Sequence, residues 1–143
     1  MNDKFAIDTN TLVYAFDESE GEKRNKCFKL INSIFKGEKQ AYITNQIIAE
    51  TFITLLKKVD NPNPLENAEN IINAVINSQN WIKINYTTQT TKKAITLVKN
   101  YNLKFWDALI AATMFENDVF SLYTEDEKDF KKVPGLKVIN LMK

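Results

Sequence analysis

Four carboxylates occupy positions from which they could act on one substrate. Asp8 and Asp126 each come shortly after an apolar run that predicts a buried strand, and Glu50 and Asp107 lie early in two helix-like segments. In parallel α/β sheets, ligands bind beyond the carboxyl ends of the strands. We therefore expect the four side chains to converge on one edge of a sheet.

Such a cluster predicts a divalent metal site. Neighbouring carboxylates raise each other's pKa, and a bound cation removes the repulsion. A site made only of oxygen ligands favours Mg²⁺, Mn²⁺ or Ca²⁺ over Zn²⁺ or Cu²⁺. Mg²⁺ or Mn²⁺ can activate water, and a pair of ions about 3.5–4 Å apart can hold both oxygens of a phosphodiester displacement. The pattern indicates phosphoryl-transfer chemistry without naming the substrate.

Asp107 is the most informative of the four acids. The segment Trp106–Phe115 is apolar nearly all round, which is typical of a buried helix, and Asp107 is its only charged residue. A carboxylate there has to be paired, hydrogen-bonded or bound to metal. The alternative is a first-turn Asp that the helix dipole stabilises by ~0.3–1 kcal/mol.

The other three acids have ordinary alternatives when each is taken alone. Asp8 could be a turn residue at a strand end, and Glu50 could be a solvated side chain on the polar side of its helix. Asp126 lies in the charge run Glu125–Asp129, which is typical of an exposed loop. Only their convergence would favour a functional interpretation.

Composition removes many other chemistries. The chain of 143 residues has no His and one cysteine, Cys27. Ser-His-Asp sites, Cys-His sites and His-based ribonuclease mechanisms are therefore excluded, and a zinc site lacks ligands. The net charge is +1 and Arg24 is the only Arg, so any RNA contact would come from local lysines that bind phosphate.

The expected compartment is the cytoplasm. A single cysteine cannot form an internal disulfide, which fits a reducing environment. The N-terminus has no apolar signal region. No apolar run approaches the ~20 residues of a membrane span, so no membrane association is expected.

Alternating apolar segments predict a three-layer α/β fold with a mostly parallel sheet and one domain over residues 1–143. The expected strands are Phe5–Ile7, Ala41–Thr44, Trp81–Ile84, Val119–Tyr123 and Leu136–Ile139. The expected helices are Thr11–Phe16, Glu22–Lys36, Ile47–Val59, Pro64–Ser78, Gln89–Asn100 and Trp106–Glu116.

Several details of these elements can be predicted as well. Asn10 is a plausible N-cap of the first helix. Asp60–Pro64 is expected to be a loop. The fourth helix should turn four residues inward: Ile71, Ile72, Val75 and Ile76.

Several motifs resemble those of PIN-domain ribonucleases, in particular the VapC toxins of VapBC toxin–antitoxin pairs. They occur in the expected order over essentially the whole chain. The motifs are Asp8-Thr9-Asn10-Thr11-Leu12, Ile48-Ala49-Glu50, Phe105-Trp106-Asp107-Ala108-Leu109-Ile110-Ala111-Ala112, Leu122-Tyr123-Thr124-Glu125-Asp126 and the closing segment Pro134–Asn140. The Trp-Asp-Ala-Leu-Ile-Ala-Ala segment, together with Thr-Glu-Asp, is the specific part of the match.

The resemblance implies a five-stranded sheet in a PIN-like α/β/α fold and assigns roles to residues. Its catalytic and metal-binding residues would be Asp8, Glu50, Asp107 and Asp126. Asn10 and Thr124 would orient them, as supporting residues do around metal ligands. Asp129 is either an outer member of the site or, as we favour, a surface turn carboxylate.

The resemblance also implies an activity and partners. The activity would be Mg²⁺- or Mn²⁺-dependent endonucleolytic cleavage of structured RNA such as tRNA or rRNA. The partners would be a cognate antitoxin and a second copy of the chain in a homodimer. The pairs Lys57-Lys58, Lys92-Lys93 and Lys131-Lys132 could line an RNA path, although surface solubility is the simpler interpretation. Trp81 and Trp106 are expected in the core rather than stacked on bases.

Two alternatives belong to other functional classes. One is a PIN-like module that binds RNA or protein without cutting it. The presence of all four acids argues against this alternative. The other is a phosphohydrolase of the haloacid dehalogenase type. Those enzymes have a second Asp two residues after the first, and Asn10 stands there in this chain.

Overall fold

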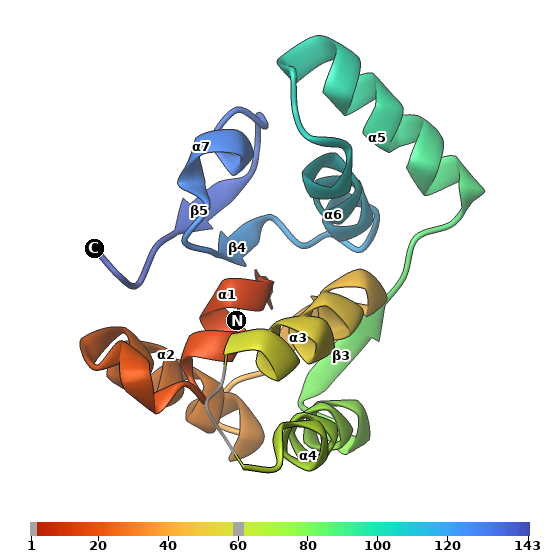
Figure 1. Ribbon diagram of the computed structural model, residues 1–143. Helices are drawn as coiled ribbons and strands as arrows, with labels where there is room; N and C mark the ends of the chain where they lie inside the picture. The colour runs from red at the N-terminus through yellow and green to blue at the C-terminus, as the bar shows by residue number, and fades with distance from the viewer. Residues whose placement is uncertain (1–2, 59–61) are drawn as a thin grey trace.

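A five-stranded parallel sheet forms the centre of the molecule. The computed structural model in Figure 1 describes residues 3–58 and 62–143. The strand order is β3-β2-β1-β4-β5, and every neighbouring pair is parallel. The strands are β1 (Phe5–Ile7), β2 (Ala41–Thr44), β3 (Trp81–Ile84), β4 (Ser121–Tyr123) and β5 (Lys137–Ile139). The predicted three-layer α/β class is confirmed.

Six of the helices follow the sequence prediction to within about two residues, the usual uncertainty of helix ends. The helices are α1 (Thr9–Tyr14), α2 (Glu22–Phe35), α3 (Asn45–Lys58), α4 (Pro64–Asn77), α5 (Thr88–Tyr101), α6 (Phe105–Glu116) and α7 (Glu127–Phe130), with a short 3-10 turn at Glu18–Glu20. Helix α7 and the 3-10 turn were not predicted. Val59 and residues 60–61 of the predicted loop lie outside the described residues.

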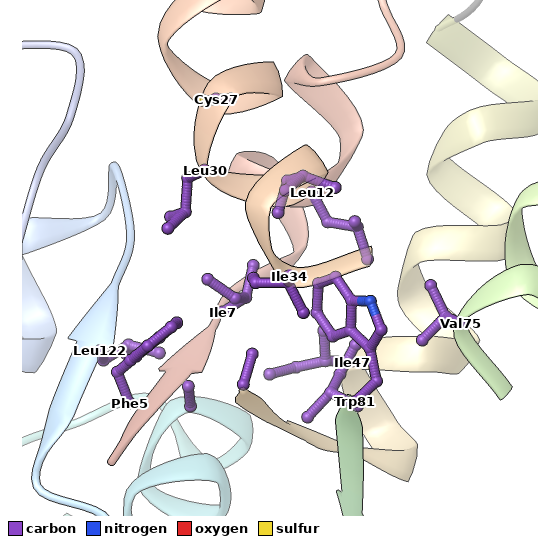
Figure 2. Packing of buried hydrophobic residues seen from close by; sticks show 14 of the residues in the cluster. Phe5, Ile7, Leu12, Cys27, Leu30, Ile34, Ile47, Val75, Trp81 and Leu122 are labelled. Atoms are coloured by element: carbon purple, nitrogen blue, oxygen red, sulfur yellow. The ribbon is translucent and has the colours of Figure 1, made fainter. Parts of the chain in front are cut away.

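The main core lies between the central strands and the helices that cover them. Figure 2 shows Ile7 of β1, Ile34 of α2 and Trp81 of β3 meeting in this cluster. Each is at most 1% exposed, and burying one such side chain contributes roughly 1.5–3 kcal/mol. The prediction that Trp81 belongs to the core is confirmed.

Helix α4 differs from its prediction at one position. Val75 is fully buried and Ile71 is partly buried, but Ile76 is 47% exposed. Ile71 packs with Ala68 against the buried Leu55 of α3. Because successive helical residues point about 100° apart, Ile76 turns away from the layer that buries Val75.

Helix α6 is buried almost all round, as its composition predicts. Every residue from Ala108 to Met114 is buried, and several of them pack against α5 in a second core cluster. The expectation for Trp106 was wrong, because its side chain is 57% exposed. Trp106 lies in the first turn of α6, where its ring meets only the edge of Phe105 (centroids 5.3 Å apart) among the described ring contacts.

No helix within residues 3–58 and 62–143 combines the length and apolarity that a membrane span requires.

Candidate active site

The carboxyl ends of β1, β2 and β4 open into one pocket of about 360 Å³. The chain continues from these ends into α1, into α3 and into the segment before α7. The four predicted acids all line this pocket, and Asn10 lines it with them: Asp8, Asn10, Glu50, Asp107 and Asp126. The structure therefore brings together side chains that lie up to 118 residues apart in the chain, the separation of Asp8 and Asp126.

Asp8 is held rigidly at the start of α1. It is 8% exposed, and it accepts hydrogen bonds from the Thr9 N–H (2.8 Å) and the Thr124 hydroxyl (2.7 Å). Burial raises the pKa of Asp8, and the two hydrogen bonds oppose that rise. Asp8 is also the N-cap of α1, so the prediction of Asn10 as the cap was wrong. The helix begins earlier because the carboxylate next to Thr9 accepts its free N–H.

Thr124 connects two of the acids. Its side chain is completely buried. The hydroxyl donates to Asp8 Oδ2 and accepts from the Asp126 N–H at 3.0 Å. One hydroxyl thus fixes the direction of the Asp8 carboxylate and the backbone that carries Asp126, which is the arrangement expected of an orienting residue.

Glu50 is half-buried and doubly hydrogen-bonded rather than free in solvent. It accepts from the Thr9 hydroxyl (3.2 Å) and from Gln46 Nε2 (3.1 Å). Gln46 Nε2 also lies 3.3 Å from the carbonyl oxygen of Trp106. The sequence analysis missed Gln46, although an amide four residues before a carboxylate on one helix is a recognisable pair.

Three carboxylates form the tightest group in the pocket region. One oxygen each from Asp107, Asp126 and Asp129 lies within 4.8 Å of the others. Burial, followed by the negative charges of Asp126, Asp8 and Asp129, raises the pKa of Asp107 to about 7. Asp107 Oδ2 is buried and has no hydrogen-bond partner in the described part of the chain. A buried carboxylate oxygen without a donor is a place where a cation or a proton fits.

The position of Asp129 overturns its favoured interpretation as a surface turn residue. It is 7% exposed and belongs to the acidic group. Helix α7 folds the charge run into a turn that buries Phe130 to 1% exposure and carries Asp129 inward. The three-residue spacing of Asp126 and Asp129 was the available signal, because residues three apart share one face of a helical turn.

Some of the lysines proposed for an RNA path contact carboxylates of the chain itself. Lys93 pairs with Glu116 at 2.7 Å and Lys131 with Glu127 at 2.8 Å. Lys132 lies 3.3 Å from Asp129. Exposed ion pairs are weak and exchange readily, so contact with RNA phosphates stays a prediction.

The geometry and the motifs agree with one family model. The model described as the PIN domain matches residues 5–136. The chain belongs to the PIN-domain family. The resemblance drawn from the acidic motifs is thereby confirmed, and the match includes every residue of this PIN domain that lines the acidic pocket.

Solved structures share the fold of this PIN domain at low sequence identity. One is a toxin–antitoxin complex from Klebsiella pneumoniae (22% identity, 98% of each chain covered, TM-score 0.67). Another is VapC20 from Mycobacterium tuberculosis, described as a sarcin–ricin loop cleaving toxin (17% identity, 87% of this chain and 91% of that chain covered, TM-score 0.67). A third is VapBC2 from Rickettsia felis bound to a promoter DNA fragment (19% identity, 96% of this chain and 98% of that chain covered, TM-score 0.67). No curated protein matches the sequence.

Proposed function

We propose that this PIN domain is a Mg²⁺- or Mn²⁺-dependent endoribonuclease that cuts structured RNA such as tRNA or rRNA. The observation that carries the proposal is the acidic pocket, in which a buried oxygen of Asp107 has no donor among the described residues and lies beside two other carboxylates. Family membership supports nuclease chemistry. The solved relative described as a sarcin–ricin loop cleaving toxin supports RNA as the substrate class.

In this proposal Asp8, Glu50, Asp107 and Asp126 hold the cation, and Asp129 completes the group on the α7 side. All are oxygen donors, which suits Mg²⁺ or Mn²⁺. When bound, such a cation activates water and neutralises charge on the phosphate. Thr124 and Thr9 hold the carboxylates of Asp8 and Glu50 in place through their hydroxyls.

We also propose that the chain is the toxin of a type II toxin–antitoxin pair, acts in the cytoplasm and forms a homodimer. The solved relative from Klebsiella pneumoniae is described as a toxin–antitoxin complex, and the one from Rickettsia felis as VapBC2. A cognate antitoxin would therefore be the expected protein partner. Co-expression with the protein encoded beside it, followed by purification through one tagged chain, tests this part separately from catalysis.

The decisive experiment is RNA cleavage by purified, partner-free protein. Structured RNAs including tRNA are incubated with Mg²⁺ or Mn²⁺, with EDTA, and with the Asp107→Asn variant as the control for contaminating nucleases. We expect discrete, metal-dependent cuts that disappear in the variant. Cuts that persist in the variant would contradict the assignment of Asp107 as a catalytic, metal-binding residue.

A non-catalytic PIN-like module that binds RNA or protein is the competing function. It predicts no cuts in any RNA and no Mn²⁺ binding by calorimetry. Metal binding without cuts would instead point to a nuclease with a narrower substrate. The two measurements together separate these outcomes.

A further inference from the structure

A second groove adjoins the acidic pocket along the same edge of the sheet. It has a volume of about 400 Å³ and shares Glu50 and Ile53 with the acidic pocket. Its far wall comes from Asn85 and Tyr86, which follow the end of β3, and from Trp106 at the start of α6. Since β3 lies beyond β2 in the strand order, the groove extends from the acidic pocket toward the β3 side of the sheet.

The side chains of this groove are suited to a flat, neutral ligand. Trp106 is 57% exposed and Tyr86 is 42% exposed, so two aromatic side chains are available to solvent in one hollow. The amides of Asn45 and Asn85 can both donate and accept hydrogen bonds. Glu50 is the one charged residue among the described lining residues, which disfavours a phosphate as the ligand of this groove.

Gln46 joins the groove to the acids. Its side-chain amide lies within hydrogen-bond distance of both Glu50 Oε1 and the backbone carbonyl of Trp106. The start of α6 is therefore tied to the carboxylate that faces the pocket. A ligand on the Trp106 ring would lie in the same groove as Glu50, which also lines the acidic pocket.

We propose that Trp106 and Tyr86 form a stacking subsite for one unpaired base of the RNA, next to the phosphate held at the acids. The inference rests on the proposed ribonuclease function and adds a substrate preference to it. Sequence-tolerant stacking on aromatic side chains is how proteins commonly hold splayed-out bases. A strand with an unpaired base beside the cut should bind better than a continuous duplex.

Binding can be measured without cleavage in the wild-type protein, the parent, with Ca²⁺ in place of Mg²⁺, because oxygen ligands also bind Ca²⁺ and Ca²⁺ activates water poorly. The probe is a fluorescein-labelled single-stranded oligoribonucleotide of about 12 nucleotides, within the usual range of single-strand site sizes. Fluorescence anisotropy gives its Kd for the parent, for Trp106→Ala and for Trp106→Phe. Phe120→Ala is the matched control, because Phe120 is also an exposed aromatic (48%) but precedes β4 at the opposite end of the strand.

We expect Trp106→Ala to raise the Kd about fivefold or more, the loss that one stacked base implies. Trp106→Phe should retain most of the affinity, and Phe120→Ala should match the parent. An abasic strand of equal length should bind Trp106→Ala and the parent equally. Because Trp81 is 1% exposed, quenching of tryptophan fluorescence by the strand in the unsubstituted parent reports on Trp106 even if a variant folds poorly.

Three results would overturn the subsite. The parent could fail to bind the strand, or Trp106→Ala could bind it as tightly as Phe120→Ala does. Trp106→Ala could also weaken binding of the abasic strand as much as binding of the intact strand. A change from dimer to monomer in Trp106→Ala, with an unchanged Kd, would mean that a second copy of the chain covers the groove. RNA cutting by wild-type protein is scored separately, so failure of the subsite and failure of the nuclease are distinguishable.

Discussion

Asp107 combines features that are costly in a metal-free protein. Its carboxyl group lies in the first turn of a buried helix and faces Asp126 and Asp129, and no donor in the described part of the chain reaches Oδ2. Burial and the neighbouring acids raise the pKa of Asp107 from 3.8 to about 7, so between these two pH values the folded protein holds a proton there that an unfolded chain would release. Replacing this carboxyl group by a neutral amide should therefore change the stability of the protein, the pH dependence of that stability and metal binding together.

Asp107→Asn should melt at a higher temperature than wild type when both are metal-free. A carboxyl whose pKa is raised from 3.8 to about 7 contributes stability below its ordinary pKa and loses it as pH rises through about 7. The difference between the melting temperatures of the two proteins should thus be larger near pH ~8 than near pH ~5. Differential scanning fluorimetry with EDTA measures it.

Mn²⁺ should stabilise wild type and should not stabilise Asp107→Asn, because the variant lacks a ligand at the centre of the group. The same melting experiment with added Mn²⁺ is the check. Equal stabilisation of both proteins would count against a metal site at Asp107.

Thr124→Val keeps the shape of the side chain and removes its two hydrogen bonds, to Asp8 Oδ2 and from the Asp126 N–H. We expect a loss of about 1–3 kcal/mol in the free energy of unfolding, because buried groups are left unpaired. Mn²⁺ affinity should fall on the order of tenfold, as it does when a residue that orients metal ligands is lost. Denaturant titration and calorimetry measure the two effects.

Thr113→Val is the control for that substitution. Thr113 is also buried, at 2% exposure, but its hydroxyl bonds only to the Leu109 carbonyl of its own helix among the described contacts. Unchanged Mn²⁺ affinity is expected. An equal loss in both variants would show that Thr124 has no special relation to the site.

At the scale of elements, α6 is the support on which the site depends. It is buried on nearly every side, and it carries Asp107 and Trp106 at the end that faces the pocket. Helix α7 is its short counterpart, which brings Asp126 and Asp129 to the same place. The acidic group is thus assembled from two helix starts rather than from one rigid segment.

Met114→Ala should destabilise the protein by about 2–5 kcal/mol, because Met114 is completely buried and its truncation leaves a cavity. Mn²⁺ affinity measured well below the melting temperature should stay near wild type, since Met114 lies about two turns from Asp107. Ile95→Ala on α5 is the exposed control, at 48% exposure, with an expected change within about 0.5 kcal/mol. A large loss of Mn²⁺ affinity in Met114→Ala would contradict this separation of stability and site.

At the scale of the whole molecule, the strand order decides where the chemistry lies. Placing β1 between β2 and β4 puts Asp8 between the segments that carry Glu50 and Asp126. Strand β3 lies next to β2, and the residues that follow β3 line the second groove, which adjoins the acidic pocket. The organisation of residues 1–143 as one domain stays a prediction.

The proposed homodimer should have about twice the mass of the 16.5 kDa chain in solution. Light scattering coupled to size-exclusion chromatography measures this directly. The measurement is made over a range of protein concentrations, because dimers of this size class can dissociate on dilution. A single monomer mass at the highest concentration would contradict the prediction.

Local patterns determined much of this protein. Apolar runs of strand and helix length located all five strands and six of the helices, and an all-apolar helix around one Asp pointed to a constrained carboxylate at Asp107. The order of the acidic motifs led to the family. These features depend on neighbours in the chain, and hydrophobic periodicity reports on such neighbours directly.

Only the tertiary structure decided which polar and aromatic side chains are buried and which meet. Helix α7 has four residues, too few to show a period, so Asp129 seemed to belong to an exposed charge run. Trp106 seemed apolar enough for the core, but the packing of α6 on α5 leaves its side of the first turn uncovered. Burial and proximity depend on how distant elements pack around the sheet, and no local spacing in the sequence records that arrangement.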